Sequence, residues 1–408
     1  MISFQIEKME ELLIYQANLL KNLPTKWHRF LYFKLPENER LLGIKGLRGV
    51  GKSTLLLQLL SKKLSEGKKA MYVTVEHPYF YKNSLFDLVS TWYSYGGRYF
   101  FIDEIHKYSN WSRELKLIYD GFPDLKVVFT SSSALDLYKG ESDLSRRLAV
   151  VVLPGLSFRE FLEFNYHQSL SKLNLEDLIN HAHEISQSIF TQLEQPILPL
   201  FKEYLQTGYF PLTLEYSSEQ ILQRLIRIIN AVLESDLAQI QGFSADNLIK
   251  IKQLLGVIAE SVPFEPNISK LAEKMHLGRQ TINIYLKNLE DAKILHLLYE
   301  KSSGISLLQK PGKIYFENSN FLFSFQGSPS IGTIRETFFL NQLKNAGHRI
   351  SLAKKGDFVI NDEFTFEVGG KNKENTQIKG IDKGYLAIDD IEIGIGQKIP
   401  LWLFGFLY

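Results

Sequence analysis

Cysteine is absent from the 408-residue chain. This excludes a disulfide scaffold, thiolate metal sites and a thiol nucleophile. Net charge is also nearly absent, since 47 basic side chains are balanced by 45 acidic ones, so a basic face can only be local. No apolar run reaches the ~20 residues of a membrane helix, and the N-terminus lacks the apolar core of a signal peptide. The C-terminal IPLWLFGFLY alternates like a buried strand. We therefore expect a cytoplasmic protein with no membrane partner.

The length, the composition and the pattern of apolar segments indicate an α/β fold. The length predicts two or three domains at about 150 residues each, and 45% hydrophobic residues can build their cores. Residues 1–40 have helical spacing. From Leu41 to about Leu153, short apolar segments alternate with helical patterns, which predicts a mostly parallel sheet covered on both faces. The predicted strands are LLGIKG, AMYVTV, RYFFID, KVVFT and LAVVVL.

The strongest motif is GLRGVGKS at residues 46–53, which fits GxxxxGK[ST] between a strand and a helix. Its glycines let backbone N–H groups point inward at a phosphate, and the helix N-terminus adds partial positive charge. Lys52 is expected to reach the β- and γ-phosphates, and Ser53 to bind Mg²⁺. The alternative is a glycine-rich turn that binds nothing. The predicted ATP-binding residues are Gly46, Leu47, Arg48, Gly49, Val50, Gly51, Lys52, Ser53 and Thr54.

Two carboxylates follow the apolar segment YFFI at residues 99–102. Asp103 is expected to hold Mg²⁺ through water, and Glu104 to act as the general base that activates water. A kinase of small molecules would not need Glu104, so hydrolysis is favoured. The segment DEIH also fits the DExH box of helicases. A helicase needs a second RecA-like domain, however, and nothing after residue 150 repeats the strand–helix alternation.

Further polar groups follow the strand KVVFT. Thr130, Ser131 and Ser132 are candidates to sense the γ-phosphate, with a serine-rich helix cap as the alternative. In a homo-oligomer, Arg146 or Arg147 is a candidate to reach a neighbour's γ-phosphate. The alternative is a surface arginine pair.

These motifs together resemble one branch of prokaryotic AAA-type ATPases. The resemblance rests on GLRGVGKSTLL, FIDEIHK, FTSSSALDL, LPGLSFREFLEF and TGYFP in this order. It implies ATP binding, five parallel strands with the phosphate loop after the first, and a C-terminal half made of a winged helix and a restriction-endonuclease-like domain. We therefore expect an α/β parallel-sheet P-loop ATPase core, a helical lid, a winged helix and an α+β nuclease-like domain. Their expected ranges are 1–165, 166–243, 244–306 and 307–408.

Residues 268–289 have the spacing of a helix-turn-helix, with Gly278 at the turn. The strand 295–298 and a following hairpin would form the wing. This interpretation has Lys287 and Lys293 meeting phosphates. The alternative is a winged helix used only for packing or protein contacts. The side chains expected to face a DNA major groove are Arg279, Gln280, Thr281 and Asn283.

Three acids near the C-terminus are spaced as in restriction-type nucleases, where carboxylates hold Mg²⁺ and a lysine steadies the attacking water. They are Glu336 on a helix, Asp357 at a strand start and Glu367 at a strand end. Gly369 stands where the pattern requires lysine, which favours a retained fold without the chemistry. The candidate replacements and further lining residues are Lys371, Lys373, Gln377 and Tyr385.

The combined hypothesis is an ATP-hydrolysing AAA-type ATPase that drives its C-terminal module, with DNA as the candidate partner and ATP and Mg²⁺ as cofactors. Two alternatives stay open. One is a nucleotide-switched regulatory protein with little turnover, and the other is a metal-dependent DNase.

Overall fold

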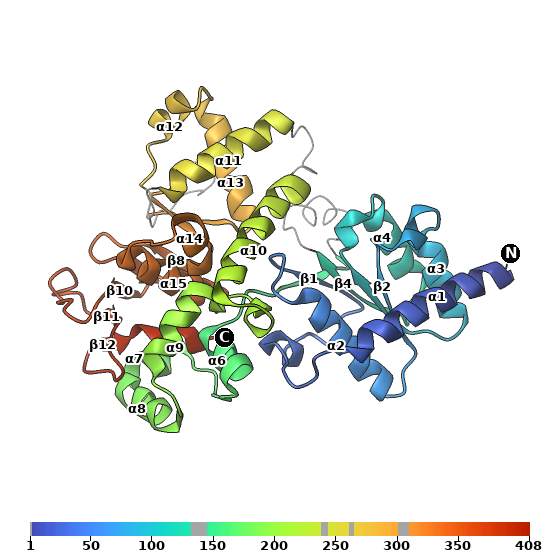
Figure 1. The fold of residues 1–408 in the computed structure, drawn as a ribbon, viewed down its shortest axis with the longest axis horizontal. Helices are drawn as coiled ribbons and strands as arrows, with labels where there is room; N and C mark the ends of the chain where they lie inside the picture. Colours follow the sequence, from blue (N-terminus) through green and yellow to red (C-terminus); the bar gives the residue numbers. More distant parts are fainter. Residues whose placement is uncertain (1, 132–143, 145, 238–243, 261–264, 301–309) are drawn as a thin grey trace. The chain divides into compact units, whose positions relative to one another are not determined.

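The computed structural model describes residues 2–131, 144, 146–237, 244–260, 265–300 and 310–408 (Figure 1). The chain divides into two compact units, which we call the N-terminal unit (Met1–Pro154) and the C-terminal unit (Gly155–Tyr408). The four ranges expected from the sequence are finer than these two units, and their boundaries stay predictions.

The N-terminal unit is built on a five-stranded sheet in the order β2-β3-β4-β1-β5. Every pair in it is parallel, as the alternation of strands and helices predicted. The expected α/β sheet is therefore confirmed, and the carboxyl ends of its strands meet at one edge. The strands are β1 (Leu41–Lys45), β2 (Ala70–Thr74), β3 (Tyr99–Asp103), β4 (Lys126–Ser131) and β5 (Ala149–Val152).

Helices pack on both faces of this sheet. On one face, Phe100 and Ile102 of β3 share a core with the apolar sides of α3 and α4. On the other face, Phe101 lines the same pocket as Leu59 of α2. The side chain of Gln16 on α1 accepts a hydrogen bond from the backbone N–H of Tyr72 at 2.7 Å, which covers the edge strand β2. The helices are α1 (Ile2–Lys21), α2 (Lys52–Ser65), α3 (Leu85–Ser94) and α4 (Trp111–Gly121), with 3-10 turns at Phe30–Phe33, Pro78–Tyr81 and Ile105–Lys107.

The C-terminal unit starts with a run of helices, as the sequence predicted for this segment. The ring of Phe158 on α6 lies 5.2 Å from that of Phe201 and 6.0 Å from that of Phe406 near the chain end. The first helices therefore share one core with the C-terminal end. The elements are α6 (Phe158–Tyr166), α7 (Leu175–Asn180), α8 (Ala182–Gln192), α9 (Ile197–Glu203), α10 (Ser218–Ala231), π turns at Tyr204–Gly208 and Val232–Asp236, and a 3-10 turn at Pro211–Leu214.

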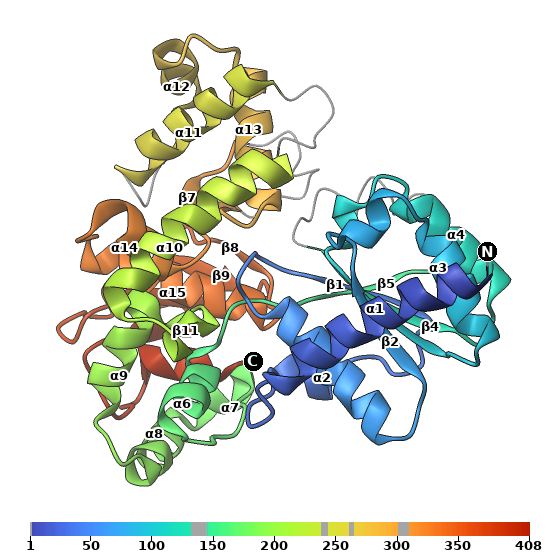
Figure 2. The same ribbon diagram turned by 45° about the vertical axis from the view of Figure 1, so that its right-hand side comes forward.

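Three helices and an antiparallel hairpin follow (Figure 2). The face of α13 that the spacing predicted to be apolar is buried, including Ile282, Tyr285 and Leu286. Asn267 begins α12 by accepting a hydrogen bond from the N–H of Lys270. The elements are α11 (Ala245–Ala259), α12 (Ile268–Lys274), α13 (Arg279–Asp291), β6 (Leu295–Leu298) and β7 (Lys313–Phe316).

The chain ends in a mixed five-stranded sheet, in the order β12-β11-β10-β9-β8, against which α15 packs. The expected C-terminal strand is partly wrong, because Leu401–Phe406 forms a 3-10 helix. All six of its residues are buried, so the apolar pattern could not distinguish a strand from a 3-10 helix. The elements are α14 (Ser319–Gln326), α15 (Ile331–Asn345), β8 (Ile350–Leu352), β9 (Phe358–Ile360), β10 (Phe364–Gly369), β11 (Gly384–Ile388) and β12 (Lys398–Pro400). Among the described residues, no helix combines the length and apolar character needed to cross a membrane.

Candidate active site

The loop of residues 46–51 connects β1 to α2, and its three glycines are required for two different reasons. Gly49 and Gly51 have φ angles of 84° and 94°, a region where a side chain would be strained. Gly46 lies against backbone, because a Cβ there would stand 2.4 Å from the carbonyl oxygen of Leu153. The loop can therefore adopt this conformation only with glycine at positions 46, 49 and 51.

Lys52 opens α2 and is buried. Its ammonium donates to the carbonyl oxygens of Gly46 at 2.9 Å and Leu47 at 3.0 Å, so it lies over the loop. Ser53 and Thr54 follow in the first helical turn and are half-buried, as is Arg48. The predicted phosphate-binding residues thus surround one helix N-terminus.

Asp103 ends β3 and is 5% exposed. Its Oδ2 accepts a hydrogen bond from the hydroxyl of Tyr72 at 3.0 Å, and its Oδ1 accepts one from the hydroxyl of Thr130. Burial and the neighbouring Asp103 raise the pKa of Tyr72, which keeps the phenol a donor. Tyr72 escaped the sequence analysis, because a tyrosine in an apolar strand has no distinctive signal.

Thr130 also contacts the second acid. The backbone N–H of Glu104 donates to the Thr130 hydroxyl at 2.9 Å. Of the three sensor candidates, Thr130 therefore joins the two acids, and Ser131 ends the same strand β4. Ser132 lies outside the described residues.

Glu104 has φ 55°, an uncommon conformation for a residue with a side chain. Its Oε2 lies 3.5 Å from Nε2 of His106. Burial, with repulsion from Lys52 among its lesser causes, lowers the pKa of His106 to about 3. His106 is therefore a neutral imidazole beside the carboxylate.

The two arginine-finger candidates differ. Arg147 donates to both carboxylate oxygens of Asp120, at 2.9 and 3.1 Å, whereas Arg146 is exposed. Their role toward a neighbouring chain stays a prediction.

The predicted DNA-contacting residues lie at the start of α13. Arg279, Gln280 and Asn283 are exposed, and Thr281 is half-buried. Lys287 forms ion pairs with Glu290 at 3.0 Å and Asp291 at 2.9 Å. Two carboxylates therefore already contact this lysine.

The three predicted nuclease-like acids each have a partner in the C-terminal unit. Glu336 accepts a hydrogen bond from the Tyr315 hydroxyl at 2.6 Å, and Asp357 accepts one from the backbone N–H of Val368 at 2.8 Å. Glu367 forms an ion pair with Lys373.

Their electrostatics place these acids near one another. Burial raises the pKa of Glu336 and of Glu367, and in both cases the charge of Asp357 adds to the rise. Lys371 is exposed and Lys373 contacts Glu367, so of the two candidate lysines Lys373 is the one at the acids. The amide of Gln377 lies 2.9 Å from Glu367.

Tyr385, by contrast, packs its ring 5.6 Å from that of Phe366. In the parts of the chain that the structure describes, no group of three His, Asp or Glu residues is arranged to hold a metal ion.

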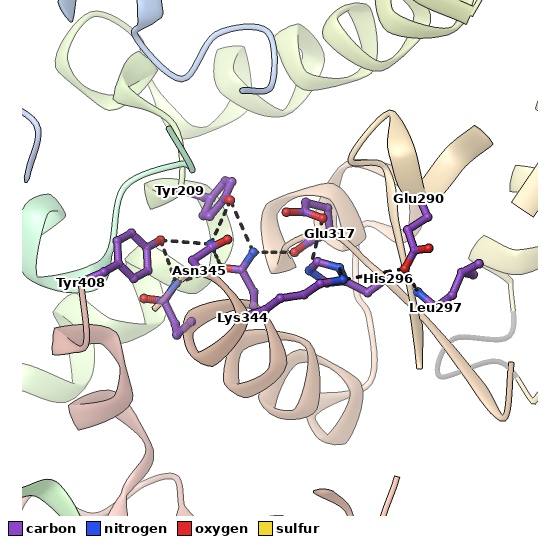
Figure 3. Close-up of polar contacts among 10 residues, drawn as sticks. Tyr209, Glu290, His296, Leu297, Glu317, Lys344, Asn345 and Tyr408 are labelled. Carbon is purple, nitrogen blue, oxygen red and sulfur yellow. Dashed lines mark hydrogen bonds and ion pairs between the residues drawn. The ribbon is translucent and has the colours of Figure 1, made fainter. Parts of the chain in front are cut away.

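A second polar cluster, which the sequence analysis missed, joins β6, the end of β7 and α15 (Figure 3). The Lys344 ammonium lies 2.9 Å from Nδ1 of His296, and His296 Nε2 lies 3.2 Å from Glu317 Oε2. Burial raises the pKa of Glu317 to about 7 and lowers that of His296. The Asn345 amide continues the cluster to the hydroxyl of Tyr209 at 3.3 Å.

Family models match two stretches of the chain. Residues 38–162 match the AAA domain, and this stretch carries the parallel sheet, the loop and the paired acids. Residues 198–326 match a domain of unknown function, DUF8612. The chain therefore contains a segment that matches the AAA domain, and its five-stranded parallel sheet fits an α/β P-loop ATPase core.

No curated protein matches the chain. Solved structures give weak likenesses. DnaA from Aquifex aeolicus bound to AMPPCP is 12% identical, over 69% of this chain and 89% of that one, with a TM-score of 0.28. The Aeropyrum pernix ORC1 protein in complex with DNA is 12% identical, over 76% and 91%, with a TM-score of 0.30. Domain III of Thermotoga maritima DnaA is 17% identical, over 45% and 95%, with a TM-score of 0.27. TM-scores this low carry no argument about function.

Proposed function

We propose that the protein binds and hydrolyses ATP at the carboxyl edge of its parallel sheet. The observation that carries this proposal is the convergence of three chain segments there. The loop of residues 46–53 follows β1, and Thr130 lies near the end of the neighbouring β4. Asp103 ends β3, and Glu104 directly follows it. The match of residues 38–162 to the AAA domain supports it.

In this proposal the loop amides and Lys52 bind the phosphates of ATP. Glu104 orients the attacking water and accepts its proton, while neutral His106 beside it restrains the carboxylate. Thr130 fixes the backbone of Glu104 relative to Asp103.

The residues present fit Mg²⁺. Ser53 and Asp103 offer hydroxyl and carboxylate oxygens, which are the ligands that Mg²⁺ prefers. The hydroxyls of Tyr72 and Thr130 fix the Asp103 carboxylate on both oxygens. Bound there, Mg²⁺ would supply charge neutralisation for the phosphates.

Steady-state ATPase assays with three variants test the proposal. Lys52→Ala should lose ATP binding, and Glu104→Gln should keep binding but lose most turnover. The control Glu76→Gln changes an exposed carboxylate that pairs with Lys107 and should behave as wild type. Equal turnover by wild type and Glu104→Gln would instead favour the nucleotide-switched regulator.

For the C-terminal unit, we propose that α11–α13 with the β6–β7 hairpin form a winged helix acting on DNA. The exposed polar start of α13 supports this. Gel shifts at increasing salt, with and without nucleotide, test it, because phosphate contacts make binding salt-dependent. The absence of salt-dependent binding in every nucleotide state would contradict it.

We propose further that the final sheet and α15 form a restriction-endonuclease-like fold without nuclease activity. Gly369 supports this, since it stands where the nuclease pattern requires lysine. Among the described residues, no three His, Asp or Glu side chains are arranged to hold a metal ion. Incubation of supercoiled DNA with Mg²⁺ or Mn²⁺ should leave it intact. Nicking that Asp357→Ala abolishes would establish the DNase alternative.

A further inference from the structure

We propose that Arg29 is a positioning residue of the nucleotide site, which holds the phosphate loop in its binding conformation. Arg29 lies 17 positions before the motif and belongs to none of the segments that indicated ATP binding. The inference rests on the proposed function, since it concerns the same site.

The Arg29 side chain donates hydrogen bonds to two backbone carbonyls. One guanidinium nitrogen donates to the carbonyl oxygen of Val50 at 2.6 Å, and the other donates to that of Pro154 at 2.8 Å. The residue is only 5% exposed. Hydrogen bonds from an ionised donor in such a setting are stronger than neutral ones, so the two carbonyls are firmly held.

The contact at Val50 determines where the next N–H points. In a trans peptide the C=O and the following N–H are directed to opposite sides. With the Val50 oxygen held by Arg29, the N–H of Gly51 is turned away from Arg29. Gly51 precedes the first turn of α2 and has φ 94°, a conformation that glycine enters and leaves at little cost. Arg29 therefore fixes the Val50–Gly51 peptide of the loop, with the Gly51 N–H available to a phosphate.

The contact at Pro154 connects the loop to the end of the N-terminal unit. Pro154 is the last residue of that unit. Just before it, the N–H of Leu153 donates to the carbonyl oxygen of Lys45 at 2.7 Å. One guanidinium thus bridges the phosphate loop and the segment through which the chain leaves the N-terminal unit.

The segment just before Arg29 is held by the helix that follows the loop. The side-chain amide of Gln58 on α2 donates to the carbonyl oxygens of Pro24 at 2.8 Å and Trp27 at 2.7 Å. Gln58 is buried. The segment before β1 is therefore fastened to α2 at one point and to the loop at another, which makes it part of the site.

Isothermal titration of the full chain with ADP and with ATP tests the inference. Arg29→Ala should weaken the binding of both nucleotides about ten-fold or more, the effect of losing one charge-assisted hydrogen bond. Arg29→Lys, whose single ammonium can replace part of the contact, should fall between wild type and Arg29→Ala.

Arg40→Ala is the matched control. Arg40 also donates to two backbone carbonyls, those of Tyr119 at 2.7 Å and Phe122 at 3.0 Å, but these lie at the end of α4. This variant should lower the melting temperature and leave the Kd for ADP unchanged. A merely structural Arg29 would behave in the same way.

The outcomes separate the two proposals. If wild type binds neither nucleotide, the proposed function fails. If wild type binds and folded Arg29→Ala has the same Kd, Arg29 is no positioning residue. Should Arg29→Ala not fold, Arg29→Lys decides, because a weaker Kd supports the inference and an unchanged one overturns it.

Discussion

Replacing Thr130 by valine removes the hydroxyl that links Asp103 to Glu104 and keeps the shape of the side chain. Valine has nearly the volume of threonine, and position 130 is fully buried, so packing is retained. The hydroxyl that donates to Asp103 and accepts from the N–H of Glu104 is lost. Asp103 keeps its bond from Tyr72.

The cost follows from these two bonds. A hydrogen bond to a charged group contributes about 1.5–3 kcal/mol, and a buried N–H left without a partner costs about 1–3 kcal/mol. Glu104 is half-buried, so the cost of leaving its N–H without a partner should lie near the lower limit, about 1 kcal/mol. We expect Thr130→Val to lower the free energy of unfolding of the N-terminal unit by about 2–4 kcal/mol.

The same change should reduce ATPase activity. Glu104 has φ 55°, a conformation that costs roughly 1–2 kcal/mol for a residue with a side chain. Without the Thr130 hydroxyl the Glu104 N–H loses this bond, and the backbone should relax and move the carboxylate. We expect turnover to fall at least ten-fold, while ADP binding is preserved.

Urea unfolding and a coupled ATPase assay measure both effects. Thr130→Ser keeps the hydroxyl and should retain most of both properties. Tyr72→Phe removes a donor to Asp103 but leaves the Glu104 bond, so it should lower stability more than turnover. Wild-type stability and turnover in Thr130→Val would refute the positioning of Glu104 by Thr130.

Four further variants probe other parts of the molecule. Gly46→Ala should abolish nucleotide binding in a titration, because its Cβ would lie 2.4 Å from the Leu153 oxygen. In Glu317→Gln, neutral buried His296 should make the free energy of unfolding rise with pH up to about 6.5, since only the unfolded chain then binds that proton. In His296→Gln it should instead fall between about pH 4.5 and 7, because buried Glu317 keeps a proton that the unfolded chain releases. Phe158→Ala should destabilise the C-terminal unit by about 3–5 kcal/mol in calorimetry, whereas a loss under 1 kcal/mol would contradict its placement in the core.

Local chemistry made the AAA domain predictable. Four strands of its sheet are short, largely buried runs, whereas β5 is partly exposed. The loop pattern lies between the first strand and its helix. Each of these signals is complete within about ten residues. The family resemblance implied five parallel strands with the phosphate loop after the first, but the order β2-β3-β4-β1-β5 was not predicted. The segment Leu401–Phe406 shows the limit, because a fully buried 3-10 helix has no apolar side to detect.

The residues that escaped prediction act over long sequence separations. Tyr72 reaches Asp103 across 31 positions, and Arg29 reaches Pro154 across 125. The cluster in Figure 3 joins His296 to Lys344 across 48. The residues that escaped prediction lie in no recognisable sequence motif, and each meets its partner only in the folded chain. A local pattern cannot encode such a pair, because the identity of neither residue specifies the other.

These long-range contacts have one feature in common that bears on mechanism. The catalytic candidates Lys52 and Glu104 come from motifs, whereas the groups that restrain them come from elsewhere in the chain. Thr130 restrains the backbone of Glu104, and Arg29 holds the loop in which Lys52 lies. A loop with two glycines at positive φ is inexpensive to distort, so a motif alone does not ensure a formed phosphate site. Its readiness to bind depends on residues that the motif does not contain, and the Arg29 and Thr130 variants should therefore impair binding and turnover separately.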